Sequence, residues 1–303
     1  MKLSVVIPTY LREQVLIDTC AQLLEHMDPV DMELLVIDQT PLHESQVKEW
    51  LQINASQGKI RHIRQNTPSL TQARNTGLIQ ARGEIVLFLD DDVIIHKDLL
   101  ENNLRWYRSA EIGAVTGEVY NCTDPLNPPP LDHPELGTRR HSGINVAQYA
   151  KNTSGGNHSV RRLLALSSGG YDEQFVGSAL AEDLDFSQRL MAAGGKIWYD
   201  PEAWIIHLGL KSGGCGVSGT RIWPEWMHSA NLLLYAFRHG KRQKNTVRFL
   251  WMSLRNGPLR KEIIIRPWRW PGAVIGFVRG LVYGWRHRHP PPPIMPVSSR
   301  NGF

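Results

Sequence analysis

The sequence predicts an α/β fold in which helices flank a mostly parallel, Rossmann-like sheet, followed by a basic helical extension. Short apolar segments alternate with segments of helical length through the first part of the chain, as in βαβ units. The apolar run Ile85–Leu89 ends in Asp90–Asp92, as expected where a buried strand reaches the ligand-binding edge of a parallel sheet. Basic residues and tryptophans then gather after Met227.

The individual elements follow in chain order from the apolar runs and the turn residues between them. We expect strands at 3–8, 33–38, 60–64 and 85–90, with helices at 13–26, 44–54 and 70–81 between them. Right-handed crossovers place the ends of three of these strands along one edge of the sheet, namely Pro8–Thr9, Asp38–Gln39 and Asp90–Asp92. This edge forms a crevice of nucleotide size.

The later part of the α/β domain, which we assign to residues 1–226, continues the pattern less regularly. We expect a helix at 97–107, a strand at 114–120, a helix at 181–193, and strands at 196–199 and 203–207. Between residues 121 and 142 the chain is rich in Pro, Asp and Gly, which indicates a long loop of the kind that often serves as a lid.

The three aspartates at 90–92 carry the strongest chemical signal. Adjacent carboxylates repel one another unless a hard cation neutralises them, and Mg²⁺ or Mn²⁺ with a phosphate is the usual partner. The alternative is a solvated acidic turn that caps the next helix, because Asp is a good N-cap.

The chain after Met227 differs in composition from the rest. Fourteen of the 34 Lys and Arg residues follow Met227, but only one acid, Glu262, does so. The same stretch contains Trp251, Trp268, Trp270 and Trp285. This composition suits an anionic membrane surface, and nucleic acid or a solvated basic helix pair are the competing interpretations. We predict a membrane-associating helical extension at 227–289 with no nucleic acid partner, and a disordered, proline-rich tail at 290–303.

Two segments superficially resemble membrane signals. Residues 1–8 are basic and then apolar, but Pro8 ends the run, which favours a first strand over a signal peptide. Residues 270–285 contain Pro271 and Arg279 and are shorter than the roughly 20 residues that a spanning helix needs.

The cysteines at 20, 122 and 215 lie far apart, which indicates a reducing compartment. We expect a cytoplasmic protein that lies peripherally on the inner face of the cell membrane.

Six motifs follow one another in order between Leu3 and His207. They are Val5–Tyr10, Val36–Asp38, Ala73–Gly77, Phe88–Asp92, Glu182–Phe186 and His207 itself. In this order they resemble the inverting family 2 glycosyltransferases. The resemblance implies a GT-A fold, a nucleotide-diphosphate sugar as donor, Mn²⁺ or Mg²⁺ as cofactor, and transfer of a hexose or deoxyhexose to an acceptor hydroxyl.

The resemblance also implies which residues bind the donor. Pro8, Thr9 and Tyr10 would border the base and ribose, and Asp38 would accept a hydrogen bond from a pyrimidine N3–H. The family often has a second acid where this chain has Gln39, so UDP-type and dTDP-type donors both stay open. Arg74 would pair with the diphosphate, for which a guanidinium group is well matched. The remaining donor-binding residues would be Asn75, Asp90, Asp91 and, after the glycines at 155 and 156, Asn157.

Metal binding and proton transfer are implied in the same way. Asp92 would ligate the metal and His207 would be a further ligand, and imidazole suits Mn²⁺ better than Mg²⁺. Asp183 would be the general base that takes the proton of the attacking hydroxyl, and Glu182 would hold the acceptor or tune the pKa of that base. Both acids could instead serve only the dipole of their helix, and a histidine after an apolar strand is often structural.

We therefore predict a metal-dependent inverting glycosyltransferase of cell-surface polysaccharide or glycolipid biosynthesis, with a glycan or a lipid-linked acceptor. A sugar-phosphate nucleotidyltransferase is the first alternative, but it requires a glycine- and cation-rich loop after the first strand, which residues 8–12 do not provide. A non-catalytic nucleotide-binding module is the second. Such a module has no need to keep Asp92, Asp183 and His207 together.

Overall fold

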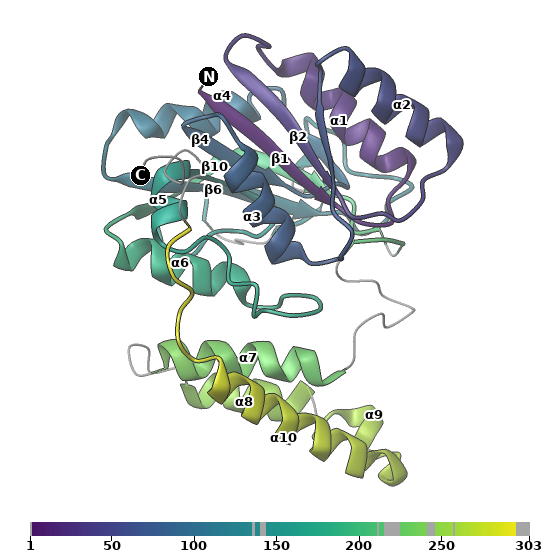
Figure 1. The fold of residues 1–303 in the computed structure, drawn as a ribbon, viewed down its shortest axis with the longest axis vertical. Helices are drawn as coiled ribbons and strands as arrows, with labels where there is room; N and C mark the ends of the chain where they lie inside the picture. Colours follow the sequence, from purple (N-terminus) through teal and green to yellow (C-terminus); the bar gives the residue numbers. More distant parts are fainter. Residues whose placement is uncertain are drawn as a thin grey trace, which may run out of the picture.

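The computed structural model describes residues 2–134, 137–139, 144–210, 212–214, 225–240, 246–256 and 258–294. An α/β unit occupies one end of the molecule and a helical unit formed by residues 225–289 occupies the other (Figure 1). No helix in these ranges has the length and apolar content that crossing a membrane requires.

The α/β unit contains one mixed sheet with helices on both faces. Its strands are β1 (Leu3–Thr9), β2 (Met32–Asp38), β3 (Arg61–Arg64), β4 (Ile85–Leu89), β5 (Val93–Ile95), β6 (Ile112–Asn121), β7 (Thr138–Arg139), β8 (Gln148–Ala150), β9 (Asn157–Arg161) and β10 (Lys196–His207). Its helices are α1 (Gln14–His26), α2 (Ser45–Ser56), α3 (Leu70–Gln80), α4 (Leu99–Leu104), η1 (Arg105–Arg108), α5 (Arg162–Ser167) and α6 (Glu182–Ala192). The helical unit comprises α7 (Glu225–His239), α8 (Thr246–Asn256), α9 (Lys261–Ile264), η3 (Pro267–Arg269) and α10 (Trp270–Arg286).

The strand order in the described sheet is β3-β2-β1-β4-β9-β6-β10-β5. The first four strands are parallel, which confirms the predicted βαβ units. β9 lies antiparallel between β4 and β6, and β5 pairs antiparallel with the end of β10. The predicted strands at 196–199 and 203–207 form a single strand, whose register shifts between Asp200 and Ile205. The fold prediction is therefore confirmed, although β9 and β5 add antiparallel pairs to the sheet.

Alternation along each strand builds two hydrophobic layers, one on each face of the sheet. Val5 and Leu87 contribute to the layer under α1 and α2, while Val6 and Phe88 contribute to the layer under α3, α5 and α6 (Figure 1). All five residues of β4 are buried, as expected for a strand covered on both faces. β4 can therefore deliver Asp90–Asp92 to the sheet edge in a fixed position.

The helical unit is built on a close contact between α7 and α10. Three glycines of α10 recur every fourth residue, at 276, 280 and 284, and so lie on one helix face. A Cβ atom at Gly284 would lie 2.8 Å from the backbone nitrogen of Leu234, so only glycine permits this approach. The chain after α10 then returns along α6 and α5 to the α/β unit (Figure 1).

This return differs from the predicted disordered tail at 290–303. The backbone N–H of Ile294 donates to the carbonyl of Leu166 at 2.8 Å, and its side chain packs on the layer that contains Phe88. Residues 290–294 are thus an ordered part of the α/β unit, because the apolar side chain of Ile294 is partly buried against this layer. Residues 295–303 lie outside the described ranges.

Candidate active site

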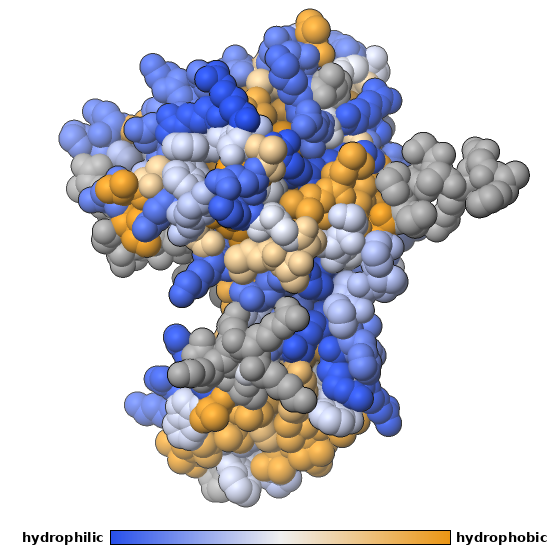
Figure 2. Space-filling view, turned by 90° about the vertical axis from the view of Figure 1, so that its left-hand side faces the viewer, coloured by the Kyte–Doolittle hydropathy of each residue, from blue (hydrophilic) through white to orange (hydrophobic). Residues whose placement is uncertain are grey.

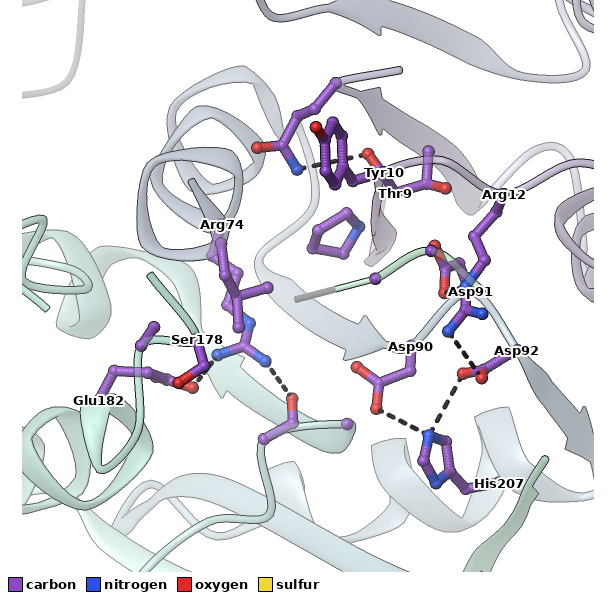
Figure 3. A pocket seen from close by; sticks show the side chains of 18 of the residues that line it. Thr9, Tyr10, Arg12, Arg74, Asp90, Asp91, Asp92, Ser178, Glu182 and His207 are labelled. Carbon is purple, nitrogen blue, oxygen red and sulfur yellow. Dashed lines mark hydrogen bonds and ion pairs between the residues drawn. The ribbon is translucent and has the colours of Figure 1, made fainter. Parts of the chain in front are cut away.

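A cavity of about 450 Å³ opens at the carboxyl edge of β1 and β4 (Figure 3). Ten of the thirteen residues predicted for the site line it, from elements far apart in the chain. They are Pro8, Thr9, Tyr10, Arg74, Asp90, Asp91, Asp92, Glu182, Asp183 and His207. Three predicted residues, Asp38, Asn75 and Asn157, do not line it. The sheet edge therefore gathers most of the predicted site, as the βαβ argument requires.

His207, at the end of β10, faces the aspartates that follow β4. Its Nε2 lies 3.3 Å from Oδ1 of Asp92 and 4.0 Å from Oδ2 of Asp90 (Figure 3). Its Nδ1 donates to Oδ1 of Asn121 at 3.2 Å, which orients the ring. Burial lowers the pKa of His207, but the hydrogen bond to Asp92 and the charges of Asp90 and Asp92 outweigh burial and leave the pKa raised.

The donor set of this cluster suits a divalent cation, although no three of the described His, Cys, Asp and Glu side chains are already arranged as metal ligands. Oδ1 of Asp92 and Nε2 of His207 face one another, and the Asp90 carboxylate beside them is 38% exposed to the cavity side. The hydrogen bond from Nδ1 to Asn121 is the outer contact that a metal-binding imidazole normally has. Two carboxylates and one imidazole match the preferences of Mn²⁺.

Arg12 is the main cavity residue that the sequence analysis missed. Its Nε donates to Oδ1 of Asp91 at 3.1 Å and one terminal nitrogen donates to Oδ2 of Asp92 at 2.8 Å. The backbone N–H of Leu210 also donates to Oδ2 of Asp92, at 3.0 Å. Arg12 thereby fixes the orientation of Asp92 and leaves only Oδ1 of that residue toward His207. No motif marks Arg12, and its position just after the first strand was the only available signal.

Burial and charge act in opposite directions on Asp91. Burial raises the pKa of Asp91 to about 6, and neighbouring Asp92 adds to the increase, while Arg12 opposes it. Without Arg12, the buried carboxylate of Asp91 would lose the cation that opposes its repulsion from Asp92. The guanidinium group therefore makes the aspartate run compatible with a folded sheet edge.

Arg74, on α3, approaches the first turn of α6 on the other side of the cavity. One terminal nitrogen donates to Oε1 of Glu182, and the other donates to the carbonyl of Gly155 at 2.6 Å (Figure 3). Burial raises the pKa of Glu182 to about 7, the charge of Arg74 opposes this, and neighbouring Asp183 adds to it. Asp183 is half-buried and lines the cavity, so it is the more accessible of the two acids.

Two glycines separate the aspartates after β4 from the acids of α6. A Cβ atom at Gly156 would lie 2.1 Å from Oδ2 of Asp90, and one at Gly155 would lie 3.8 Å from Oδ2 of Asp183. The two carboxylates thus lie on either side of a glycine pair, and the lack of a side chain at Gly156 leaves room for the Asp90 carboxylate. This contact joins the two halves of the site.

Backbone strain gathers around the same cavity. Among the described residues, the non-glycine residues with positive φ are Leu11 at 54°, Ala179 at 52° and Ala181 at 71°. Ala179 and Ala181 line the cavity just before α6, and Leu11 lies between Tyr10 and Arg12. Non-glycine residues pay about 1–3 kcal/mol for such conformations, which persist where the surroundings fix them and concentrate at functional sites.

Asp38, which was predicted to bind the donor base, does not line the cavity. Its fully buried carboxylate accepts hydrogen bonds from Nε2 of His62 at 2.9 Å and Nε2 of His43 at 3.1 Å, and it pairs with Arg64. Its other oxygen accepts from the backbone N–H of Thr40 at 2.8 Å. Two of these partners, His62 and Arg64, belong to β3, and the next residue, Gln39, lines the cavity.

Asn75 and Asn157, also predicted to bind the donor, pair with backbone groups and do not line the cavity. Nδ2 of Asn75 donates to the carbonyl of Tyr171 at 2.7 Å, and its Oδ1 accepts from the backbone N–H of the same residue at 2.7 Å. Nδ2 of Asn157 donates to the carbonyls of Glu118 and Ala203 at 3.1 and 2.8 Å. Both side chains are buried and are paired with backbone groups of neighbouring segments. Neither therefore reaches the cavity.

The sheet with its acidic cavity defines a GT-A glycosyltransferase fold. Residues 4–165 match the family model described as glycosyl transferase family 2, and the chain belongs to that family. The TarS protein of Staphylococcus aureus, solved as residues 1–349 with UDP-GlcNAc, matches with a TM-score of 0.63 and 17% identity over 95% of this chain and 88% of that one. A Pyrobaculum calidifontis mannosyltransferase solved with GDP-Man and Mn²⁺ matches with a TM-score of 0.56 and 17% identity over 93% of this chain and 75% of that one.

Curated relatives match only over part of their length. The succinoglycan biosynthesis protein ExoM of Rhizobium meliloti is 30% identical over 139 residues, which are 45% of this chain and 44% of that protein. The poly(ribitol-phosphate) β-N-acetylglucosaminyltransferase TarP of Staphylococcus aureus is 33% identical over 121 residues, 39% of this chain and 36% of that protein. This chain therefore spans less than half the length of these two relatives.

Proposed function

We propose that this protein is a metal-dependent, inverting glycosyltransferase that moves a sugar from a nucleotide-diphosphate donor to an acceptor hydroxyl. The observation that carries the proposal is the single cavity that joins Asp90, Asp92 and His207 to Asp183 across two glycines. Inversion by direct displacement needs a carboxylate opposite the leaving diphosphate, and this cavity presents one.

Each side of the cavity has a distinct role in this proposal. Asp183 accepts the proton of the acceptor hydroxyl as the new bond forms, since it is more accessible than the buried Glu182. Asp92 and His207, with Asp90 beside them, would hold a divalent cation, which neutralises charge on the departing diphosphate when bound. Arg12 orients Asp92 for that task through its 2.8 Å hydrogen bond.

The proposed base contact is Gln39 rather than Asp38, because Gln39 lines the cavity and Asp38 does not. Gln39 lines the cavity beside Pro8, Thr9 and Tyr10, so these four residues are the proposed base and ribose contacts. An amide can both donate and accept, which suits the edge of a pyrimidine base. A UDP-type or dTDP-type donor of a hexose or deoxyhexose is proposed, and the likeness to TarS solved with UDP-GlcNAc supports the UDP type.

The acceptor is proposed to be a glycan or a lipid-linked glycan of cell-surface polysaccharide assembly. The name of the ExoM relative, a succinoglycan biosynthesis protein, supports this class. The basic, tryptophan-bearing helical unit supports a location at the cytoplasmic face of the cell membrane.

The substitution Asp183→Asn tests the proposal most directly. We expect sugar transfer, or hydrolysis of the donor where no acceptor is supplied, to fall by about 10²- to 10⁴-fold, the usual contribution of a general base. Nucleotide binding in the presence of Mn²⁺ should persist, because Asp183 does not belong to the proposed metal cluster. A panel of nucleotide sugars supplies the donor, and Asp98→Asn, an exposed carboxylate before α4, is the control. Full activity of Asp183→Asn would refute the proposed base.

A further inference from the structure

The helical unit exposes a group of large apolar side chains at the end of the molecule away from the sheet. Figure 2 shows an orange area at the lower end of the molecule, where the helical unit of Figure 1 lies. We call this group the apolar face, and its members are Trp251, Ile264, Ile265, Trp268, Trp270, Ile275, Val278, Val282 and Trp285. Three of them, Ile265, Trp268 and Ile275, are 63–74% exposed.

The two faces of α10 explain why these residues remain uncovered. The glycine face of α10 packs against α7, where a Cβ atom at Gly280 would already lie 3.1 Å from the backbone nitrogen of Ala230. Ile275, Val278, Val282 and Trp285 recur at helical spacing on the outer side. An amphipathic surface helix normally turns polar residues outward, so α10 is apolar on the side where water is expected.

Cations surround the apolar face, and acids are nearly absent from this part of the chain. Exposed Lys261, Arg266 and Arg286 lie on the same helical segments as the apolar residues. The guanidinium group of Arg288 lies 4.2 Å from the centre of the Trp285 ring, and that of Arg279 lies 4.2 Å from the Trp226 ring. Glu225 and Glu262 are the only acids in the sequence from 225 to 303.

We propose that the apolar face docks this protein on the interface of a bilayer that contains anionic lipid. Trp and aliphatic side chains would enter the headgroup region, while the surrounding cations would meet lipid phosphates. This inference names the surface behind the peripheral location given under the proposed function, and it does not depend on the identity of the reaction.

Three other occupants fit the observations less well. α10 is too short to span a bilayer, because its 17 residues rise about 25 Å whereas the hydrocarbon core is about 30 Å thick. A second copy would bring the same cations face to face in a two-fold contact. Nucleic acid calls for cations and stacking rings along a groove, whereas exposed isoleucine and valine side chains form much of this face.

Docking would also fix the orientation of the active site. Arg238 of α7 pairs with Asp172 at 2.7 Å and with Asp185 of α6 at 2.8 Å. His239 lies 2.8 Å from the same Asp185 oxygen. Because α6 also carries Asp183, a bilayer bound by α8 to α10 would hold the catalytic helix at a set orientation to the membrane surface.

Vesicle sedimentation tests the proposal with the full-length chain. Wild-type protein should sediment with vesicles of phosphatidylcholine that contain about one third phosphatidylglycerol, and much less with pure phosphatidylcholine. The combined variant Ile265→Ser, Trp268→Ser and Ile275→Ser should bind the anionic vesicles at least about tenfold more weakly. A matched control replaces three exposed apolar residues of the α/β unit, Val30→Ser, Leu42→Ser and Leu163→Ser, and should bind as wild type does.

Two further measurements separate the possible outcomes. Donor hydrolysis in solution should be unchanged in the combined variant, which shows that it folds and that a failure of docking is not a failure of the proposed reaction. Size-exclusion chromatography and retention on DNA are measured in parallel. Failure of the wild type to bind anionic vesicles, or equal binding by the combined variant, would overturn the proposal. A wild-type dimer or DNA complex that this variant abolishes would also overturn it.

Discussion

Replacing Gly156 by alanine probes the junction between the two halves of the site. The new Cβ would lie 2.1 Å from Oδ2 and 2.6 Å from Cγ of Asp90, whereas real Cβ atoms stay beyond 3.0 Å of their neighbours. The Asp90 side chain is partly exposed and can swing aside, so the fold should survive. Its carboxylate, however, must move by about 1 Å, away from the position that faces His207.

A displacement of this size at a reacting centre costs about 10²-fold in rate. We therefore expect kcat/KM for donor turnover to fall about 100-fold, equivalent to about 2.7 kcal/mol of transition-state stabilisation. The assay is Mn²⁺-dependent turnover of whichever nucleotide sugar the wild type accepts, together with thermal unfolding to confirm that the variant is folded.

Gly155→Ala is the matched control, because its Cβ would find its nearest neighbour, a terminal nitrogen of Arg74, at 3.4 Å. It should retain activity within about threefold. If the mechanism of loss is displacement of Asp90, then Gly156→Ala combined with Asp90→Ala should be no worse than Asp90→Ala alone. Additive losses in the double variant would refute the reasoning.

Two further predictions concern stability. Asp185→Asn leaves Arg238, His239 and Arg189 without their shared carboxylate and should cost about 3–5 kcal/mol in unfolding free energy at pH 7. Burial raises the pKa of Asp185, but His239, Arg189 and Arg238 outweigh burial and depress this pKa. The stabilisation is therefore present above the unfolded pKa of about 3.8 and is lost as the pH falls below that value. Denaturant unfolding curves of the wild type and the variant should converge in acid. Gly284→Ala should lower the melting temperature, at a cost of about 1–3 kcal/mol, because its Cβ would meet the α7 backbone. Gly272→Ala, with nothing within 4 Å, should raise it slightly, and equal shifts in the two glycine variants would contradict the proposed packing.

The parallel half of the fold was predictable because its signals are local. Strands β1, β2 and β4 are short apolar runs that end at a turn, and the run Ile85–Leu89 is buried throughout as expected. β9 was not predictable in the same way. Its residues Asn157–Arg161 are mostly polar, and its place between β4 and β6 depends on pairing with two strands far away in the chain.

The site shows the same division. Asp92 could be placed from the end of its strand, because open α/β sheets bind ligands at that edge, whereas Asp183 and His207 were predicted from the resemblance to family 2 glycosyltransferases. The role of Asp38 could not be read locally, because its partners His62 and Arg64 belong to β3 and become neighbours only through sheet pairing. Arg12 was missed for the converse reason, as it acts through Asp91 and Asp92, about 80 residues later in the chain.

The predicted boundary at residue 226 separates elements that the structure unites through charge. Asp185 of α6 is fully buried, and Arg238 and His239 of α7 provide two of its three basic partners. Arg238 also donates to the carbonyl of His287 at 2.9 Å, so the end of α10 is held at the same point. Removing the helical unit would leave Asp185, which lies three residues after Glu182 in α6, with Arg189 as its one remaining basic partner. A buried carboxylate that loses its cations is strongly destabilising, so the helix that carries the proposed base depends on the helical unit for its stability.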